Sequence, residues 1–235
     1  MSVPRDLAAA ALRSGIQRGA ETLGLTLEPE AITQLAAYVG LLDRWNRAYN
    51  LTAVRDPQAM VTHHVLDCLA IVEPLERQAA GRRSNVLDVG SGGGLPGVVL
   101  AICEPAWSVT CVDAVGKKAA FVQQVAGALS LPNLHAVHSR VEQIGTAAPG
   151  GGSSRFDLVT ARAFASLVEL VRLTEPVLAA GGCWAAMKGA DPIDERQALP
   201  SSVEVFHVEP LQVPGLDARR CLVWMRRKGE ATGSS

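Results

Sequence analysis

The 235-residue sequence lacks the features that mark several large classes of protein. No apolar stretch approaches the roughly 20 residues that a membrane-spanning helix needs. The N-terminal region carries Asp6 and Arg13, so we expect no secretory signal peptide. The formal net charge is −1, which means that any contact with nucleic acid must come from a local group of basic residues. These absences predict a cytoplasmic protein that does not associate with membranes.

The sequence also lacks a metal-binding or nucleophilic motif. Its five cysteines form no CxxC pair and mostly lie in apolar runs, as is typical of small buried side chains in a reducing compartment. His63 and His64 are neighbours on an expected helix and should face apart, whereas His135 and His138 should lie on opposite faces of a strand. There is no Cys–His or Ser–His–Asp arrangement. We therefore expect no metal ion and no covalent catalysis.

What the sequence does contain is enough apolar material for a core, with 48% hydrophobic residues, arranged in two patterns. Residues 1–84 have helical spacing, with one amphipathic helix over 29–45 and another over 60–75. From residue 85 onward, short β-rich runs alternate with helical segments. We expect strands at 85–90, 107–113, 133–139, 156–162, 181–189, 203–213 and 219–227, with helices at 96–104, 116–131, 166–179 and near 194–199.

This alternation predicts an α/β fold, Rossmann-like, with a mostly parallel doubly wound sheet. The last two strands have no helix between them and should pair antiparallel. We expect a helical extension at 1–84, a catalytic domain at 85–228 and a disordered tail at 229–235. The segment 148–155, rich in glycine and serine, is expected to be a flexible loop.

A glycine-rich turn follows the first expected strand, in the sequence NVLDVGSGGGLPG over residues 85–97. Such a turn between a strand and a helix is where α/β sheets bind ligands. The glycines fit two patterns. Gly92, Gly94 and Gly97 match the dinucleotide pattern G-x-G-x-x-G. The pattern G-x-G-x-G, which starts at Gly90, resembles the S-adenosylmethionine loop of class I methyltransferases.

The residues around the turn favour the second pattern. A pyrophosphate requires free backbone N–H groups at the start of the helix and no anion beside them. Asp88 precedes the turn, and Pro96 removes one N–H group. S-adenosylmethionine has no phosphate, and we expect the Asp88 carboxylate to suit its sulfonium and amino groups.

Two further acids mark an adenosine site. Asp113 ends the second expected strand, where a carboxylate accepts hydrogen bonds from ribose hydroxyls in either kind of cofactor. Val141 and Glu142 follow the third expected strand, where a backbone N–H and a carboxylate could frame an adenine. A solvated surface acid is the alternative interpretation of Glu142.

Several segments together resemble one family, the bacterial 16S ribosomal RNA guanine-N7 methyltransferase G family, formerly called glucose-inhibited division protein B. The segments that carry the resemblance are RWNRAYNLTAVRD, DVGSGGGLPG, SRVE, ARAFASL, MKG and LQVPGLD, spread from about residue 38 to 225. The resemblance implies a class I methyltransferase fold, S-adenosylmethionine as methyl donor with S-adenosylhomocysteine as product, and a guanine of 16S ribosomal RNA as acceptor. It also implies cofactor contacts by Gly90, Leu95, Val141, Glu142 and Arg162, to which the glycine turn and second strand add Gly92 and Asp113. Gly93 departs from the family, which usually has proline there, so we expect a more flexible loop.

Guanine N7 carries a lone pair and no proton, so it can attack a methyl group without a general base. The enzyme then has to align the reactants and exclude water. The substrate could be naked RNA or a small ribosomal subunit particle, and we expect a monomer. Candidate RNA contacts are Arg44, Arg47, Arg55, Lys188 and Arg220.

Alternative interpretations remain at this stage. Arg162 could hold the methionine carboxylate or an RNA phosphate, or form a structural ion pair. Asn46 and the aromatic Trp45 and Tyr49 lie beside the N-terminal arginines and could contact RNA, although Trp45 also fits the apolar stripe of its helix. At the level of the whole chain, the alternatives are a methyltransferase for a small molecule or protein, an NAD-dependent oxidoreductase, and a noncatalytic RNA-binding module.

Overall fold

The computed structural model describes residues 5–146 and 155–230. Six helical segments precede the first strand: α1 (Arg5–Thr22), α2 (Pro29–Tyr49), α3 (Pro57–Met60), the π-helical turn η1 (Val61–Leu66), α4 (Asp67–Leu69) and α5 (Val72–Ala79). The strands are β1 (Asn85–Val89), β2 (Ser108–Asp113), β3 (Leu134–His138), β4 (Phe156–Arg162), β5 (Leu178–Lys188), β6 (Val203–Leu211) and β7 (Arg220–Arg227). Between them lie α6 (Gly97–Cys103), α7 (Gly116–Ala128), η2 (Val141–Thr146), α8 (Leu167–Thr174), η3 (Glu175–Val177) and α9 (Ile193–Gln197).

The strands form one sheet in the order β3-β2-β1-β4-β5-β7-β6. The first five strands pair in parallel, whereas β7 runs antiparallel to both β5 and β6. The expected mostly parallel sheet with an antiparallel last strand is therefore confirmed. Because β1 and β4 are neighbours while the chain winds outward from each, their carboxyl ends form the topological switch point at which such sheets bind ligands.

Helix α2 is the longest element of the N-terminal part. Proline at position 29 occupies the first turn, where its missing N–H is not needed, and the helix ends at Asn50, whose left-handed backbone (φ 50°) terminates it. The buried positions of α2 recur every three to four residues, so one side of the helix faces the rest of the protein.

The single amphipathic helix expected over 60–75 is wrong in detail. The helical region begins earlier, with α3, which Asp56 caps by accepting a hydrogen bond from the backbone N–H of Ala59 (2.8 Å). The helix then widens into the π turn η1, continues as α4 and breaks at Ala70 before α5 begins at Val72. Side chains of η1 and α4 line a cavity of about 620 Å³, which gives the irregular turn a functional setting.

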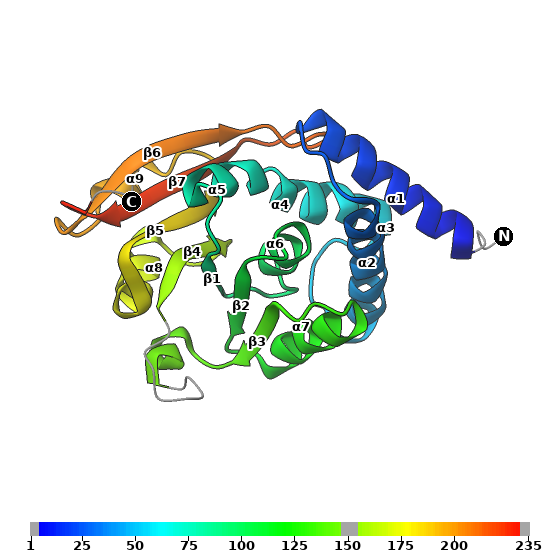
Figure 1. Ribbon diagram of the computed structural model, residues 1–235, viewed down its shortest axis with the longest axis horizontal. Helices are drawn as coiled ribbons and strands as arrows, with labels where there is room; N and C mark the ends of the chain where they lie inside the picture. The colour runs from blue at the N-terminus through cyan, green and yellow to red at the C-terminus, as the bar shows by residue number, and fades with distance from the viewer. Residues whose placement is uncertain (1–4, 147–154, 231–235) are drawn as a thin grey trace.

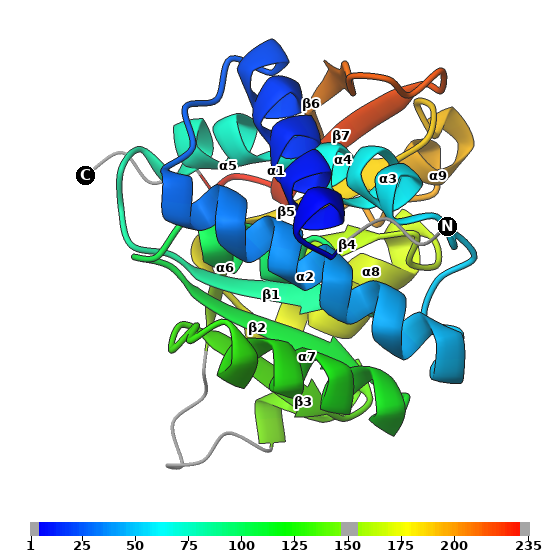
Figure 2. The ribbon, with the colours of Figure 1, turned by 90° about the vertical axis from the view of Figure 1, so that its right-hand side faces the viewer.

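The sheet separates two hydrophobic cores, and the helices are divided unequally between them. One face is covered by α6 and α7, with α2 packed on both of these helices and α1 packed on α2 (Figures 1 and 2). The other face is covered by α8 and the short helices η2 and η3. The helical segment before residue 85 is thus an additional layer over one face of the sheet, close to the carboxyl end of β1.

Two expectations fall on residues that the structure does not describe. The glycine- and serine-rich segment 148–155 lies outside the described residues except for Arg155, and the tail 229–235 does so except for its first two residues. Within residues 5–146 and 155–230, no helix has both the length and the apolar character needed to cross a membrane.

Candidate functional site

The glycine turn joins β1 to α6 at the switch point of the sheet. Gly90, Gly92 and Gly94 have left-handed backbones, with φ of 65°, 58° and 83°. Only glycine adopts such angles without strain, so these residues have a conformational requirement that matches the pattern beginning at Gly90. Gly97 has a different function, because a Cβ atom there would meet the side chains of Cys111 and Asp88.

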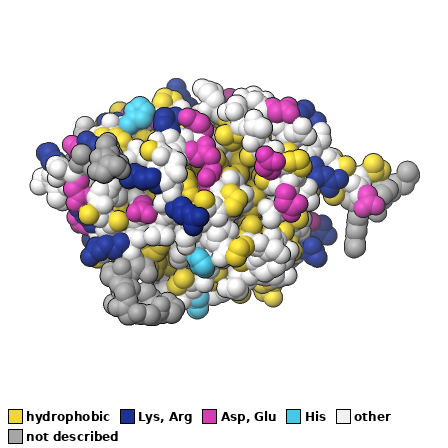
Figure 3. Space-filling model, viewed as in Figure 1, with side chains coloured by type: hydrophobic (Ala, Val, Ile, Leu, Met, Phe, Trp, Pro, Cys, Tyr) yellow, Lys and Arg dark blue, Asp and Glu magenta, His cyan; other side chains and the backbone are white. Residues whose placement is uncertain are grey.

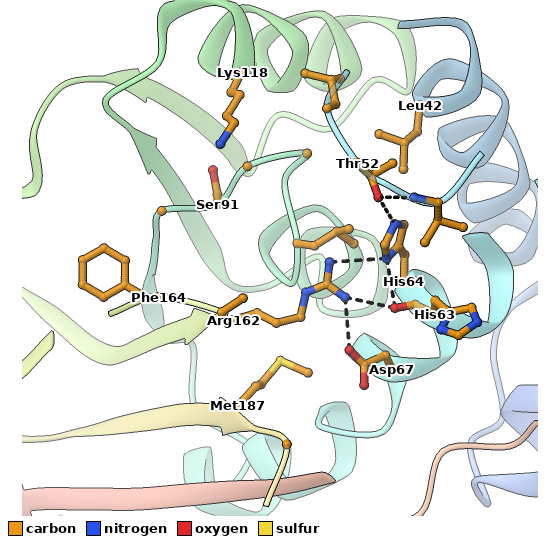
Figure 4. A pocket seen from close by; sticks show the side chains of 18 of the residues that line it. Leu42, Thr52, His63, His64, Asp67, Ser91, Lys118, Arg162, Phe164 and Met187 are labelled. Carbon is orange, nitrogen blue, oxygen red and sulfur yellow. Dashed lines mark hydrogen bonds and ion pairs between the residues drawn. The ribbon is translucent and has the colours of Figure 1, made fainter. Parts of the chain in front are cut away.

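Two cavities open on either side of the turn. The larger has a volume of about 620 Å³ and lies among the glycine turn, the segment around Thr52, the η1 turn and the ends of β4, β5 and β7 (Figure 4). The smaller, of about 300 Å³, lies between the ends of β1 and β2, the start of η2 and Phe164. Gly90 and Phe164 line both cavities, so the two cavities adjoin at these residues. We refer to the pair of cavities as the groove and to Gly90 as its bend.

Position 90, where the groove bends, requires a residue without a side chain. A Cβ atom on Gly90 would lie 2.9 Å from Cδ2 of Phe164, closer than such atoms approach in proteins. The residue before Phe164, Ala163, is a non-glycine residue with a left-handed backbone (φ 55°). Strain of this kind concentrates at functional sites, where the surrounding structure maintains it.

Asp113 lies at the carboxyl end of β2 and lines the smaller cavity. Its Oδ2 accepts a hydrogen bond from Gly92 N (3.0 Å), its Oδ1 accepts one from Val115 N (2.8 Å), and Lys118 Nζ lies 3.7 Å away. A carboxylate has about four acceptor positions, so these bonds leave capacity for a ribose hydroxyl. The residue therefore couples the glycine turn to the end of the neighbouring strand.

The smaller cavity also contains the residues expected at an adenine. Val141 is the first residue of η2 and is buried, whereas Glu142 is exposed at the rim. Both line the cavity, together with Val89 and Val112 from the sheet. The cavity thus combines apolar residues of the sheet and of η2 with two acids, Asp113 and Glu142, an arrangement that suits a nucleoside. The roles of Val141 and Glu142 remain predictions.

Arg162, at the end of β4, extends across the floor of the larger cavity (Figure 4). Its NH1 donates to Asp67 Oδ2 (3.1 Å) and to the backbone oxygen of His63 (3.1 Å). Asp67 also accepts a hydrogen bond on Oδ1 from Nε of Arg220 (2.8 Å). One nearly buried carboxylate, 4% exposed, thus holds two guanidinium groups from two different strands. The structural ion pair considered for Arg162 is present, and the two arginines leave one excess positive charge.

His64 continues this network toward the opposite wall. Its Nε2 lies 2.7 Å from Oγ1 of Thr52, and its Nδ1 lies 2.9 Å from the backbone oxygen of His63 and 3.5 Å from NH2 of Arg162. Burial, followed by the positive charge of Arg162, lowers the pKa of His64 from 6.5 to about 4. The ring is therefore neutral at physiological pH and serves as a hydrogen-bonding group.

The neutral ring makes stability depend on pH in a defined window. Because the folded pKa lies below the unfolded value, the stabilisation by neutral His64 is complete above pH 6.5 and is lost as the pH falls from 6.5 to about 4. The difference in unfolding free energy between the wild type and the His64→Gln variant should therefore change by on the order of 3 kcal/mol across this window. Urea unfolding at a series of pH values measures it.

The matched control for this measurement is the replacement of the exposed His207 by glutamine, which should keep the wild-type pH profile. Asp88 is present in all three proteins, so the difference between their curves isolates His64. Parallel curves for wild type and the His64→Gln variant would contradict the assignment.

The expectation for Asp88 is wrong. Its side chain is fully buried and is not among the residues that line either cavity in the described chain. Its Oδ2 accepts the N–H of Gly97 (2.8 Å) at the start of α6, so the carboxyl group fixes the junction between turn and helix and does not face a bound cation. Burial raises the pKa of Asp88 to about 7. The sequence shows that an acid lies near the turn. It does not show toward which side of the strand the side chain points.

The candidate RNA contacts fall into two groups. Lys188 and Arg220 line the larger cavity, and each is paired with an acid: Lys188 Nζ lies 2.8 Å from Glu195 Oε2, and Arg220 is bound to Asp67. The other group is exposed at the end of α2 and in the segment that follows it: Arg44, Arg47 and Arg55. Their roles remain predictions.

Asn46 does not belong to this exposed group, although the sequence indicates that it could contact RNA. It is 2% exposed, and its side chain accepts from Thr52 N (2.8 Å) and donates to the backbone oxygen of Val54 (3.1 Å). Trp45 packs on Phe121 with ring centroids 5.4 Å apart, in agreement with its place in the apolar stripe, and Tyr49 is exposed.

Several residues of the cavity were not expected from the sequence: Thr52, His63, His64, Asp67, Ser91, Lys118 and Phe164. A signal was available for two of them. His64 and Asp67 are three residues apart in a helical, otherwise apolar segment, so they share a face, and a polar pair on a buried face implies partners. Within the described residues, no group of three or more His, Cys, Asp or Glu side chains is arranged to hold a metal ion.

Comparison with known families supplies independent information about this site. The model of one protein family, described as rRNA small subunit methyltransferase G, matches residues 31–223. A relative named ribosomal RNA small subunit methyltransferase G from Methylibium petroleiphilum is 54% identical over 94% of this chain and 97% of its own length. A relative of the same name from Paracidovorax citrulli is 53% identical over 97% and 96%.

Solved structures show the same fold at low sequence identity. A mutant of MtNAS in complex with S-adenosylmethionine is similar with a TM-score of 0.56 and 14% identity, covering 94% of this chain and 96% of that one. TrmN from Thermus thermophilus has a TM-score of 0.52 at 15% identity, with 97% and 80% covered. At these identities the likeness supports the class I methyltransferase fold alone.

Proposed function

The chain belongs to the rRNA small subunit methyltransferase G family, and from this premise we propose that it transfers a methyl group from S-adenosylmethionine to N7 of a guanine in bacterial 16S ribosomal RNA. The observation that carries the proposal is the groove that bends at Gly90. It has one chamber that combines apolar residues with two acids, which suits a nucleoside, and one cationic chamber large enough for an amino acid chain and a second base.

The described residues fit S-adenosylmethionine. In the smaller cavity, Val141 and Glu142 would hold the adenine and Asp113 the ribose hydroxyls. Gly90 and Gly92 would leave room for the chain to cross the turn, and Leu95 lines the larger cavity next to it. The excess positive charge of Arg162 and Arg220 over Asp67 suits the methionine carboxylate. When bound, this cofactor supplies an electrophilic methyl group on a positively charged sulfur.

The protein's own contribution is alignment and exclusion of water. Guanine N7 attacks with a lone pair and loses no proton, so His64, which is neutral and already hydrogen-bonded, has no proton to accept. Apolar side chains of Leu42, Leu51 and Met187 line the larger cavity and would keep water from the reacting atoms. Transfer to N7 would move a positive charge from the donor to the base, so the residues around the cavity would face the same total charge before and after the reaction.

The partner and the setting follow from this function. We infer that the acceptor is 16S ribosomal RNA, free or in a small ribosomal subunit particle, and that the protein works in the cytoplasm, where that RNA is found. The cysteines of the described chain are free thiols, which agrees with a reducing compartment. A monomer is supported by the large exposed apolar side chains of the described residues, which are scattered singly: Leu7, Tyr49, Val115 and Ile193.

The domain division also belongs to the proposal. Residues 1–84 would act as a helical extension that completes one wall of the larger cavity, residues 85–228 as the methyltransferase domain, and 229–235 as a tail. Support comes from Leu42, Thr52, His64 and Asp67, all from the first segment, which line a cavity otherwise built from the ends of strands.

The direct test of the proposed function is methyl transfer itself. Purified protein is incubated with radiolabelled S-adenosylmethionine and small subunits from cells that lack the modification, and the labelled nucleotide is mapped. We expect label on one guanine as N7-methylguanosine. Label on a ribose, on adenine or on protein, or no transfer, would contradict the proposal.

Contact between RNA phosphates and the exposed arginines gives a further prediction. The face shown in Figure 3 has basic and acidic side chains interspersed, so binding should depend on a few local cations. Replacing Arg47 by alanine should weaken RNA binding and reduce the slope of log K against log salt by about 0.7 to 0.9 for the lost phosphate contact. Filter binding at several salt concentrations measures both.

The matched control for Arg47 is the replacement of Arg172 by alanine. Both arginines are exposed and pair with an acid one turn away on their own helix, but Arg172 lies on α8, on the other face of the sheet. An equal loss of affinity in the two variants would show that Arg47 acts only through net charge.

A further inference from the structure

Helix α2 carries a stripe of three buried side chains that point toward the groove. Tyr38, Leu42 and Asn46 are four residues apart, so they lie one above another on a single face of the helix. Tyr38 and Leu42 are 0% exposed and Asn46 is 2% exposed. Tyr38 and Leu42 contact the glycine turn, and Asn46 contacts the segment around Thr52.

Tyr38 is bound to the glycine turn. Its hydroxyl donates a hydrogen bond to the backbone oxygen of Gly93 (2.6 Å), which is itself buried. Leu42 lines the cavity and packs on the same residue, since a Cβ atom on Gly93 would lie 3.2 Å from Leu42 Cδ1. The turn is thus held from the side of α2 at its middle residue, the position where the family resemblance leads one to expect a stiffer proline.

Asn46 is bound to the opposite wall. Its two hydrogen bonds, from Thr52 N and to the oxygen of Val54, close the segment that follows α2 back onto the helix. Thr52 and Val54 both line the larger cavity. The amide of Asn46 therefore determines where this wall lies relative to the helix axis.

Helix α2 is itself firmly anchored. The ring of Phe121, fully buried on α7, packs between the rings of Tyr38 and Trp45, with centroids 6.3 Å and 5.4 Å away. Because both walls are attached to one anchored helix, the distance between them depends on two side chains, eight residues apart.

We propose that Tyr38 and Asn46 are positioning residues: from one helix, Tyr38 holds the turn that we assign to the methyl donor, and Asn46 holds the segment around Thr52, to which we assign the guanine nucleotide. This assignment deepens the proposed function and rests on it. It predicts that the two residues influence different substrates, although they are neighbours on the same helix.

The test is a comparison of KM values for the two substrates in three variants. Replacing Tyr38 by phenylalanine removes one hydrogen bond and should raise the KM for S-adenosylmethionine roughly five- to tenfold, with the KM for RNA within about twofold of wild type. Replacing Asn46 by alanine should raise the KM for RNA by a similar factor and leave that for S-adenosylmethionine unchanged. Should Asn46→Ala fail to fold, the Asn46→Asp variant is used in its place, since it keeps the acceptor for Thr52 N.

The control variant is Gln34→Leu. Gln34 lies on the same helix and donates a hydrogen bond of the same kind, to the backbone oxygen of Leu129 (3.0 Å), which lies at the end of α7 and away from the groove. The Gln34→Leu variant should have a lower melting temperature than the wild type but the same KM values for both substrates. Equal rises in both KM values in all variants, or no change in Tyr38→Phe, would overturn the proposal. Absence of methyl transfer in the wild type would instead contradict the proposed function.

Discussion

Replacement of Gly90 by alanine is expected to lower the affinity for S-adenosylhomocysteine by on the order of a hundredfold. The added methyl group would lie 2.9 Å from Phe164 Cδ2, at the bend where the two cavities meet. Either the ring or the turn must move, and both line the groove that the nucleoside has to cross. The left-handed backbone at Gly90 adds about 1–2 kcal/mol of strain. Isothermal titration calorimetry measures the affinity.

Gly81→Ala is the control for this variant, since it separates the effect of backbone strain from obstruction of the groove by the added methyl group. Its backbone is also left-handed (φ 74°), it lies between α5 and β1 far from the groove, and nothing lies within 4 Å of an added Cβ atom. Gly81→Ala should therefore lose comparable stability and retain wild-type affinity. A Gly90→Ala variant that binds as well as Gly81→Ala would show that the bend is not the cofactor site.

The second large effect is expected from Asp67→Asn. The replacement removes the charge that holds Arg162 and Arg220 and leaves two guanidinium groups without a carboxylate in a largely enclosed site. The loss of stability should be about 3–5 kcal/mol, as for other broken buried ion pairs. Methyl transfer should fall by about a hundredfold at a temperature at which the protein is still folded, because Arg162 would no longer be fixed across the cavity floor.

An exposed pair provides the comparison for Asp67. Asp191 and Arg196 form an ion pair whose side chains are 42% and 34% exposed, so Asp191→Asn should change stability by less than about 1 kcal/mol and leave activity intact. Chemical denaturation and single-turnover rates for both variants decide the matter. If Asp67→Asn kept full activity, Arg162 would not need its carboxylate partner, and the cavity floor would have to be interpreted differently.

The sequence predicts those features of this protein that depend on local periodicity. Alternating apolar runs identify all seven strands, and the missing helix before β7 predicts its antiparallel pairing. The glycine turn is also predicted from the local sequence, and it lies between β1 and α6 as expected. In each case the deciding physical factor acts within a few residues along the chain.

The features that could not be predicted depend on contacts between distant segments. Asp67 on α4 is paired with Arg162 on β4 and Arg220 on β7, at separations of 95 and 153 residues. Asp88 faces the start of α6 and not the groove, which depends on how the helix packs on β1. Asn46 lies in a segment whose composition is typical of RNA binding. Its side chain is instead hydrogen-bonded to backbone groups six and eight residues further along the chain.

The central claim is that the groove bent at Gly90 holds S-adenosylmethionine, or its product S-adenosylhomocysteine, across the glycine turn. A crystal structure with S-adenosylhomocysteine, grown in the presence of an equal concentration of NAD, tests it most directly. We predict adenosine in the smaller cavity, with its ribose at Asp113, and homocysteine in the larger cavity beside Arg162. A dinucleotide with its pyrophosphate at the glycine turn, or S-adenosylhomocysteine bound elsewhere, would contradict the claim.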